Sequence, residues 1–201
     1  MKEDFNSRAR VWDQNPMHRK RAETIAQAIK EWEQVPSERA LDFGAGTGLL
    51  GFLLADRFQT LVLMDTAEEM LRVIEEKAIQ NNLTSMQTLH MDLSDELYRG
   101  PAFDCIFTQM VLHHIEDVPL ILERFRCMLK PGGRLYIADL YPEEGGFHTP
   151  DFKGHKGLDP DWLMSILEQM GFDACSQQPV FSITKNEKAY PMFLLRARLS
   201  D

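Results

Sequence analysis

The sequence predicts an α/β fold in which helices cover a parallel sheet. From residue 39 to residue 140, apolar strand-like segments alternate with amphipathic helical segments. A glycine-rich turn joins the first of these strands to the helix that follows it, as in nucleotide-binding α/β units. The length of 201 residues suits one well-buried α/β domain and is too short for two. We therefore expect a single domain over residues 1–201.

Composition limits the possible partners. The chain carries 22 basic and 31 acidic residues, a net charge of −9, which argues against a dedicated nucleic-acid binder. No apolar run reaches the roughly 18 residues of a membrane span. Three widely spaced cysteines, Cys105, Cys127 and Cys175, fit buried reduced thiols better than a disulfide framework. We expect a cytoplasmic protein with neither a nucleic-acid nor a membrane partner.

Residues 1–36 precede the first predicted strand and should form an N-terminal helical cap. The pattern predicts a short helix over residues 5–12 and an amphipathic helix over Arg19–Trp32, which Pro36 ends. These helices either pack against the sheet or form a lid over a ligand, and Trp12 weakly favours the lid.

The glycine turn follows the predicted strand Arg39–Phe43 and precedes the predicted helix Leu49–Phe58. Its pattern is D-x-G-x-G-x-G from Asp42 to Gly48, with Ala45 between the first two glycines. A dinucleotide fingerprint requires G-x-G-x-x-G, and Leu49 occupies the place of its third glycine. The spacing disfavours a nicotinamide cofactor, although a glycine-rich turn also occurs in other α/β proteins.

Acidic residues follow the next two predicted strands. Asp65 comes directly after Thr60–Met64, 21 positions beyond Gly44, where a carboxylate meets a ribose in this architecture. Thr66 is expected to cap the next helix. Asp92 follows the strand Met86–His90 and either caps a helix near residue 94 or accepts from an adenine amino group. We favour the second role because ligands of open α/β sheets bind at carboxyl strand ends.

The rest of the chain supplies further strands and one long irregular segment. Lys130–Gly133 is expected to be a tight turn, and residues 141–159 a loop, long enough to be functional or mobile. The remaining predicted elements are strands at 102–108, 134–140, 172–184 and 189–199 and helices at 118–129 and 159–170.

These pieces together resemble the class I S-adenosylmethionine-dependent methyltransferases. The resemblance implies a Rossmann-like, seven-stranded, mostly parallel sheet with helices on both faces and an antiparallel last strand. The segments that carry it are Leu41–Gly48, Leu63–Asp65, Met91–Leu93, Phe103–Ile106, Leu112–Ile115 and Leu129–Leu135.

The same resemblance implies S-adenosyl-L-methionine as cofactor, across the carboxyl ends of the first four strands. The glycine backbone would approach the methionine part, Asp65 the ribose, and Asp92 with the Leu93 amide the adenine. The residues implied in cofactor binding are Asp42, Gly44, Ala45, Gly46, Gly48, Asp65, Thr66, Asp92, Leu93 and Gln109.

The implied function is methyl transfer to a small-molecule acceptor, on oxygen or nitrogen. A hydroxyl acceptor benefits from a general base, and His113 is the candidate; alternatively, His113 only hydrogen-bonds its loop to the sheet. His114, His148 and His155 rank lower. Two other functions stay open: another enzyme that uses an adenosyl sulfonium, or a cofactor-binding module without turnover.

The long loop could also hold a metal or act as a lid. His148, Asp151 and His155 have no metal-ligand spacing that constrains a site, so the sequence predicts no metal. With residues 1–36, residues 141–158 could cover the acceptor, using Trp12 and the loop phenylalanines for apolar contact and the loop glycines as hinges.

Overall fold

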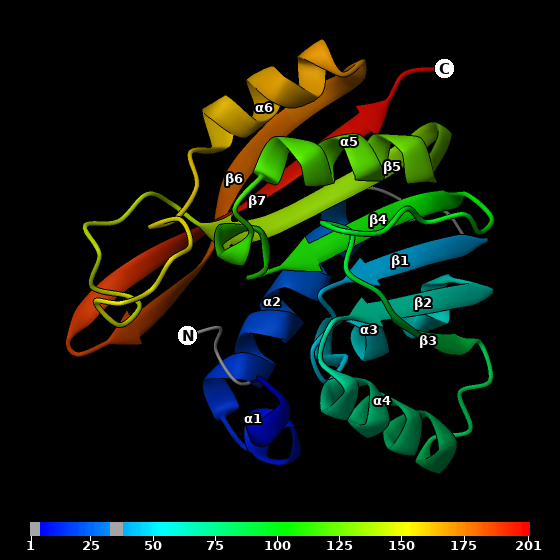
Figure 1. The fold of residues 1–201 in the computed structure, drawn as a ribbon, viewed down its shortest axis with the longest axis horizontal. Helices are drawn as coiled ribbons and strands as arrows, with labels where there is room; N and C mark the ends of the chain where they lie inside the picture. The colour runs from blue at the N-terminus through cyan, green and yellow to red at the C-terminus, as the bar shows by residue number, and fades with distance from the viewer. Residues whose placement is uncertain (1–4, 33–37) are drawn as a thin grey trace.

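The computed structural model describes residues 5–32 and 38–201 (Figure 1). The helices are α1 (Phe5–Trp12), α2 (Pro16–Trp32), α3 (Leu49–Leu54), α4 (Glu68–Gln80), α5 (Val118–Met128) and α6 (Pro160–Gln169), with 3₁₀ turns η1 (Ala55–Arg57) and η2 (Leu112–His114). The strands are β1 (Arg39–Phe43), β2 (Thr60–Asp65), β3 (Met86–His90), β4 (Phe103–Gln109), β5 (Leu129–Leu140), β6 (Phe172–Lys185) and β7 (Lys188–Leu199).

The strands form one sheet in the order β3-β2-β1-β4-β5-β7-β6. Pairings among β1 to β5 are parallel, and β7 runs antiparallel to both β5 and β6. The predicted fold class, including the antiparallel last strand, is confirmed. Because the chain returns from β3 to β4, the carboxyl ends of β1 and β4 lie side by side where the strand order reverses.

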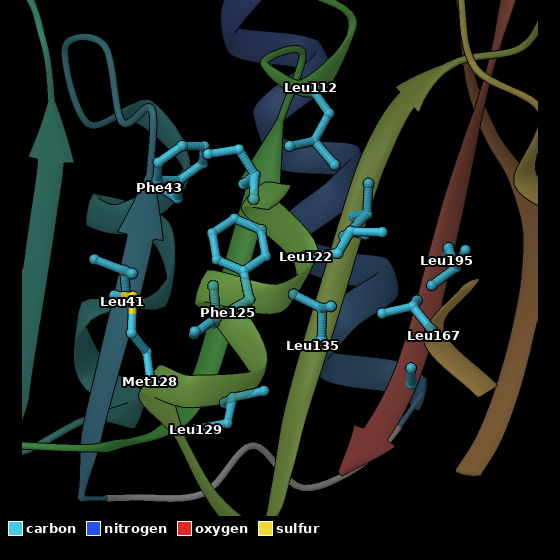
Figure 2. Close-up of a cluster of buried hydrophobic side chains, with 14 of the residues drawn as sticks. Leu41, Phe43, Leu112, Leu122, Phe125, Met128, Leu129, Leu135, Leu167 and Leu195 are labelled. Atoms are coloured by element: carbon cyan, nitrogen blue, oxygen red, sulfur yellow. The ribbon is translucent and has the colours of Figure 1, made fainter. Parts of the chain in front are cut away.

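Helices cover both faces of the sheet (Figure 1). One apolar core lies between the sheet and α5 and α6, and it includes Phe43, Phe125 and Leu167 (Figure 2). A second core on the opposite face joins α2, α3 and α4 to the alternate strand residues, such as Leu63 and Phe107. The central strands β1, β2 and β4 are buried on both faces, which explains their largely apolar sequences.

Several local predictions need correction. The α2 helix begins earlier than predicted, at Pro16, because the Asn15 side chain accepts from the Met17 amide as an N-cap. Its predicted end at Pro36 lies outside the described residues. Helix α3 ends at Leu54 and continues as the 3₁₀ turn η1.

Thr66 does not cap α4. The helix begins at Glu68 with Ala67 at the N-cap, and the Asp65 carboxylate accepts from the Ala67 amide at 2.9 Å. The aspartate at the strand end therefore satisfies a donor that the threonine was expected to satisfy.

The predicted turn at residues 130–133 is part of β5. Phe103 pairs with Leu129 and Cys105 with Arg134, so β5 advances five residues while β4 advances two. The Pro-Gly-Gly segment makes a bulge inside the strand rather than a separate turn. No helix within residues 5–32 and 38–201 combines the length and apolarity needed to cross a bilayer.

Phe125 is the residue whose truncation should cost most in the α5 core. It is fully buried, and its ring lies edge-on to Phe43 at a centroid distance of 4.9 Å. We expect Phe125→Ala to lower the free energy of unfolding by about 3–5 kcal/mol in urea denaturation. Ile79→Ala is the control, because Ile79 is 77% exposed, and should change it by no more than about 0.5 kcal/mol. Similar losses in both variants would contradict the assigned core.

Candidate functional site

The glycine turn is held by the end of the neighbouring strand. The Gly46 amide donates to Asp65 Oδ2 at 2.7 Å, and the Ala45 amide donates to the Met64 carbonyl at 2.9 Å. Gly44 has a φ of +65°, and a Cβ there would lie 2.4 Å from the Val111 side chain. Only glycine suits this conformation and this close approach.

Asp65 has structural partners on both carboxylate oxygens, Gly46 for Oδ2 and Ala67 for Oδ1. Burial raises its pKa, and these backbone hydrogen bonds oppose that rise. Each carboxylate oxygen has two lone pairs, so the side chain retains acceptor capacity for a further ligand. The predicted ribose-binding residue thus also shapes the turn.

Asp42, near the end of β1, is buried against Gly51 in the first turn of α3. Burial raises its pKa well above the usual range, and a hydrogen bond from the Gly51 amide opposes this. Its Oδ2 is buried and lacks a hydrogen-bond partner among the described residues. The side chain therefore anchors the α3 segment that follows the glycines.

Asp13, Thr47 and Lys77 form a network that the sequence analysis missed. Asp13, between α1 and α2, accepts from Thr47 Oγ1 at 2.5 Å and from Lys77 Nζ at 2.9 Å. Lys77 Nζ also donates to the Thr47 carbonyl at 2.7 Å. The N-terminal segment is thereby tied to the glycine turn. Asp13 and Thr47 are 34 positions apart in the sequence, and Thr47 and Lys77 are 30 positions apart. No helical or strand periodicity relates residues at such separations, so the sequence could not indicate these contacts.

Asp92 and Leu93 follow β3 at the same edge of the sheet. Asp92 is partly exposed, and its Oδ1 accepts from the Ser94 amide at 2.9 Å. The segment makes a turn rather than the helix considered at residue 94. The Leu93 side chain is buried in the α5 core.

Gln109 ends β4 beside the glycine turn, and Met110 follows it. Gln109 Oε1 is buried and lacks a hydrogen-bond partner among the described residues. Met110 has a φ of +57°, and its amide donates to the Ala138 carbonyl at 2.8 Å. A non-glycine residue in the left-handed region at a strand end is typical of functional sites.

His113 and Asp139 form a buried pair. The His113 side chain is fully buried, and its Nδ1 lies 2.5 Å from Asp139 Oδ1. Burial raises the pKa of Asp139, but the charge and hydrogen bond of His113 outweigh this, so the pKa lies below its usual value. In the neutral imidazole, a proton on Nδ1 that bonds to this carboxylate puts the lone pair on Nε2. His113 Nε2 is buried without a hydrogen-bond partner in the described structure.

His114 and His148 surround this pair with two further imidazoles. Ring centroids lie 4.2 Å apart for His113 and His114, and 5.1 Å apart for His113 and His148. Burial, followed by the charge of His113, lowers the pKa of His114 to about 3 and that of His148 to about 4. Both rings are therefore neutral at neutral pH.

The N-terminal helix and the long loop meet at these histidines. The ring of Phe5 in α1 lies edge-on to His114 at 5.6 Å, and the ring of Phe152 does the same at 5.2 Å. Trp12 packs against Phe5 and His18.

The long loop is hydrogen-bonded to the site beneath it. The His155 amide donates to the His113 carbonyl at 2.7 Å, and the Leu158 amide donates to the Leu140 carbonyl at 2.8 Å. A Cβ at Gly154 would lie 2.2 Å from the His113 carbonyl oxygen. This glycine allows close packing, a role that differs from the hinge that the sequence suggested.

Arg21 is a second residue that the sequence analysis missed. It lies in α2, is only 6% exposed, and its Nε lacks a hydrogen-bond partner among the described residues. Burial lowers its pKa to about 10, and Asp139 opposes this change. A basic residue in an amphipathic helix is ordinarily predicted to face solvent, so the sequence pattern of α2 did not indicate that Arg21 is buried.

Comparison with known protein families identifies the family of this chain. Residues 41–137 match the family described as Methyltransferase domain. This segment is a class I methyltransferase domain. It contains the glycine turn, Asp65, Asp92, Gln109 and His113, which the sheet brings to one edge.

The curated relatives that this domain matches are distant and longer. The chain is 32% identical over 156 residues to an uncharacterized methyltransferase of Schizosaccharomyces pombe, a match to 73% of this chain and 51% of that protein. It is 29% identical over 158 residues to phosphoethanolamine N-methyltransferase 3 of Arabidopsis thaliana, a match to 75% and 32%. The chain thus spans about half the length of the first and a third of the second.

A solved structure matches the whole fold. The methyltransferase of Haloferax volcanii in complex with the Trm112 methyltransferase activator superimposes with a TM-score of 0.79, over 100% of both chains and at 15% identity. At this identity the likeness concerns the fold alone.

The neutral His114 generates a pH prediction. Its folded pKa of about 3 lies below the unfolded value near 6.5, so the unfolded chain binds more protons between these values. Stability is therefore fully present above pH 6.5 and is lost as the pH falls through this window. Between pH 7 and pH 5, urea denaturation should show that the native protein loses about 1–2 kcal/mol more than His114→Gln. Equal losses would contradict the buried, neutral imidazole.

Proposed function

We propose that this methyltransferase domain binds S-adenosyl-L-methionine at the carboxyl ends of β1–β4 and transfers a methyl group to oxygen or nitrogen of a small molecule. The observation that carries the proposal is the meeting of the glycine turn and Asp65 with the His113–Asp139 pair at one edge of the sheet. A cofactor site and a base site next to each other are what methyl transfer requires.

The residues at this edge fit the cofactor. A Cβ at Gly46 would meet nothing within 4 Å, so the outer side of the turn is open to a ligand. The buried Gln109 Oε1 offers an acceptor to an amino group. The methionine part would contact the turn backbone at Gly44, Ala45, Gly46 and Gly48, and Asp42 would support that turn. The ribose would contact Asp65 and Thr66. The adenine would contact Asp92 and Leu93, and the sulfonium would lie near Gln109.

His113 is the proposed general base. The bound cofactor supplies a sulfonium methyl that is already activated, so the protein must mainly align the acceptor and remove its proton. Nε2 of His113 takes that proton, and Asp139 holds the ring and stabilises the resulting imidazolium. The role applies to a hydroxyl and to an ammonium group alike, because each must lose a proton before it attacks.

The acceptor class draws support from two observations. Relatives named phosphoethanolamine N-methyltransferases favour nitrogen as the methylated atom. Arg21 places a buried positive charge near Asp139, which suits an acceptor or cofactor with a carboxylate or phosphate group.

The free thiols of all three cysteines support a cytoplasmic location.

We also propose that the N-terminal segment 1–36, of which the structure describes residues 5–32, caps the site together with residues 141–158. The contacts of Phe5 and Phe152 with His114 place one aromatic ring from each segment over the histidines. Such a cover excludes water from the reacting groups.

Calorimetry tests the cofactor proposal. We expect the protein to bind S-adenosylhomocysteine and not NAD, because the third glycine lies at position 48. Asp65→Ala should weaken binding by about 1.5–3 kcal/mol, since it removes a charged acceptor. The variant must first show a native circular dichroism spectrum, because Asp65 also holds Gly46. Unchanged affinity in a folded variant would remove Asp65 from the site.

Turnover tests the base. Incubation with S-adenosylmethionine and phosphoethanolamine, ethanolamine or simple phenols should yield S-adenosylhomocysteine and a methylated product. His113→Gln should lower kcat by about 10²–10⁴ while S-adenosylhomocysteine still binds. Asp139→Asn, which keeps the shape but loses the charge, should lower kcat in the same direction. Product formed at the native rate by His113→Gln would contradict the assignment, and a cofactor that binds without any methylated product would favour the binding-module alternative.

A further inference from the structure

We propose that His113, His114 and His148 form a binding site for a divalent transition metal, with zinc as the expected ion. Each offers one ring nitrogen, and the three nitrogens lie within 4.8 Å of one another. The inference concerns metal binding alone, so it does not rest on the proposed methyl transfer.

His113 has the environment of a metal ligand. Its Nδ1 bonds to Asp139 at 2.5 Å, and its Nε2 is fully buried without a hydrogen-bond partner among the described residues. Metal-ligating histidines commonly donate their other ring N–H to a carboxylate, which fixes the tautomer and makes the ligand nitrogen more basic. A buried nitrogen without a partner is also costly, and a metal ion would satisfy it.

The other two rings complete a facing set. His114 follows His113 in the 3₁₀ turn η2, and the ring centroids of His114 and His148 lie 5.1 Å apart. Imidazole nitrogen is a ligand suited to zinc, copper, iron and nickel, whereas magnesium and calcium prefer oxygen. Three histidines leave a fourth tetrahedral position for water or an exogenous ligand.

A modest movement of the long loop would close the site. Zinc–nitrogen bonds of about 2.0–2.1 Å place tetrahedral ligand atoms roughly 3.3 Å apart. The distances between the three ring nitrogens, now within 4.8 Å, must therefore shorten by about 1.5 Å at most. His148 is the ligand that can move, because it lies in the loop while His113 is fixed to the sheet through Asp139. Phe152 stacks on His148 at a centroid distance of 3.7 Å and sets the direction of its ring. The metal would therefore fasten the loop to η2.

Metal binding and general-base action are mutually exclusive at His113. Both use the lone pair on Nε2, so a metal-loaded protein cannot accept a proton there. If His113 is the base, zinc should inhibit turnover and a chelator should restore it. The binding experiment decides the metal site whether or not turnover is found.

Metal titration of the full chain, without an affinity tag and after chelator treatment, tests the proposal. Zinc titrated in competition with a chromophoric chelator should bind with a stoichiometry of one, and cobalt should give the visible absorption of a four-coordinate site. His148→Ala should weaken zinc binding more than tenfold and abolish the cobalt spectrum. This loop variant is preferred because it spares the buried pair that holds the sheet end.

His90→Ala is the matched control. His90 is an exposed histidine outside the cluster, and its removal should leave zinc affinity unchanged. His114→Ala, if circular dichroism shows it folded, should repeat the loss seen with His148→Ala. Substoichiometric zinc binding by the native protein, or equal affinity in the native protein and His148→Ala, would show that the three rings only pack against one another.

Discussion

The parallel arrangement of β1 to β5 is the constraint on which the site depends. Because these strands point the same way, their carboxyl ends meet at one edge of the sheet. The strand order changes direction between the neighbouring strands β1 and β4, so the loops that leave these two strands turn to opposite sides. The glycine turn follows β1, Asp65 ends β2, Asp92 follows β3, and Gln109 and His113 lie at and just after the end of β4. All of them reach this edge. A change in strand order would disperse them without altering any single motif.

Burial at this edge has an energetic cost that the fold offsets locally. His113 and Asp139 are both fully buried, and each satisfies part of the other's hydrogen-bonding capacity. Removal of one partner would leave the other buried and unpaired, which is strongly destabilising. The Phe5 ring of α1 and the Phe152 ring of the long loop both lie edge-on to His114, so these contacts connect α1 to the segment after β5.

Most of the fold could be predicted because the central strands β1, β2 and β4 are mostly apolar, largely buried and bounded by turns. Glycine spacing and strand-end positions predicted which residues share the edge. One error was local, because Asp65, two residues before Ala67, takes the capping role expected of Thr66. The contacts that were missed lie across the fold, where Asp13 reaches Thr47 and Lys77 from a distant segment. The three-histidine cluster was also missed, because His148 approaches His113 only through the path of the loop.

A crystal structure of the protein with S-adenosylhomocysteine tests the central claim most directly. The account predicts the ligand across the carboxyl ends of β1 to β4, with its ribose at Asp65, its adenine beside Asp92 and its sulfur facing His113. A ligand bound elsewhere, or one in this crevice whose sulfur points away from His113, would contradict it.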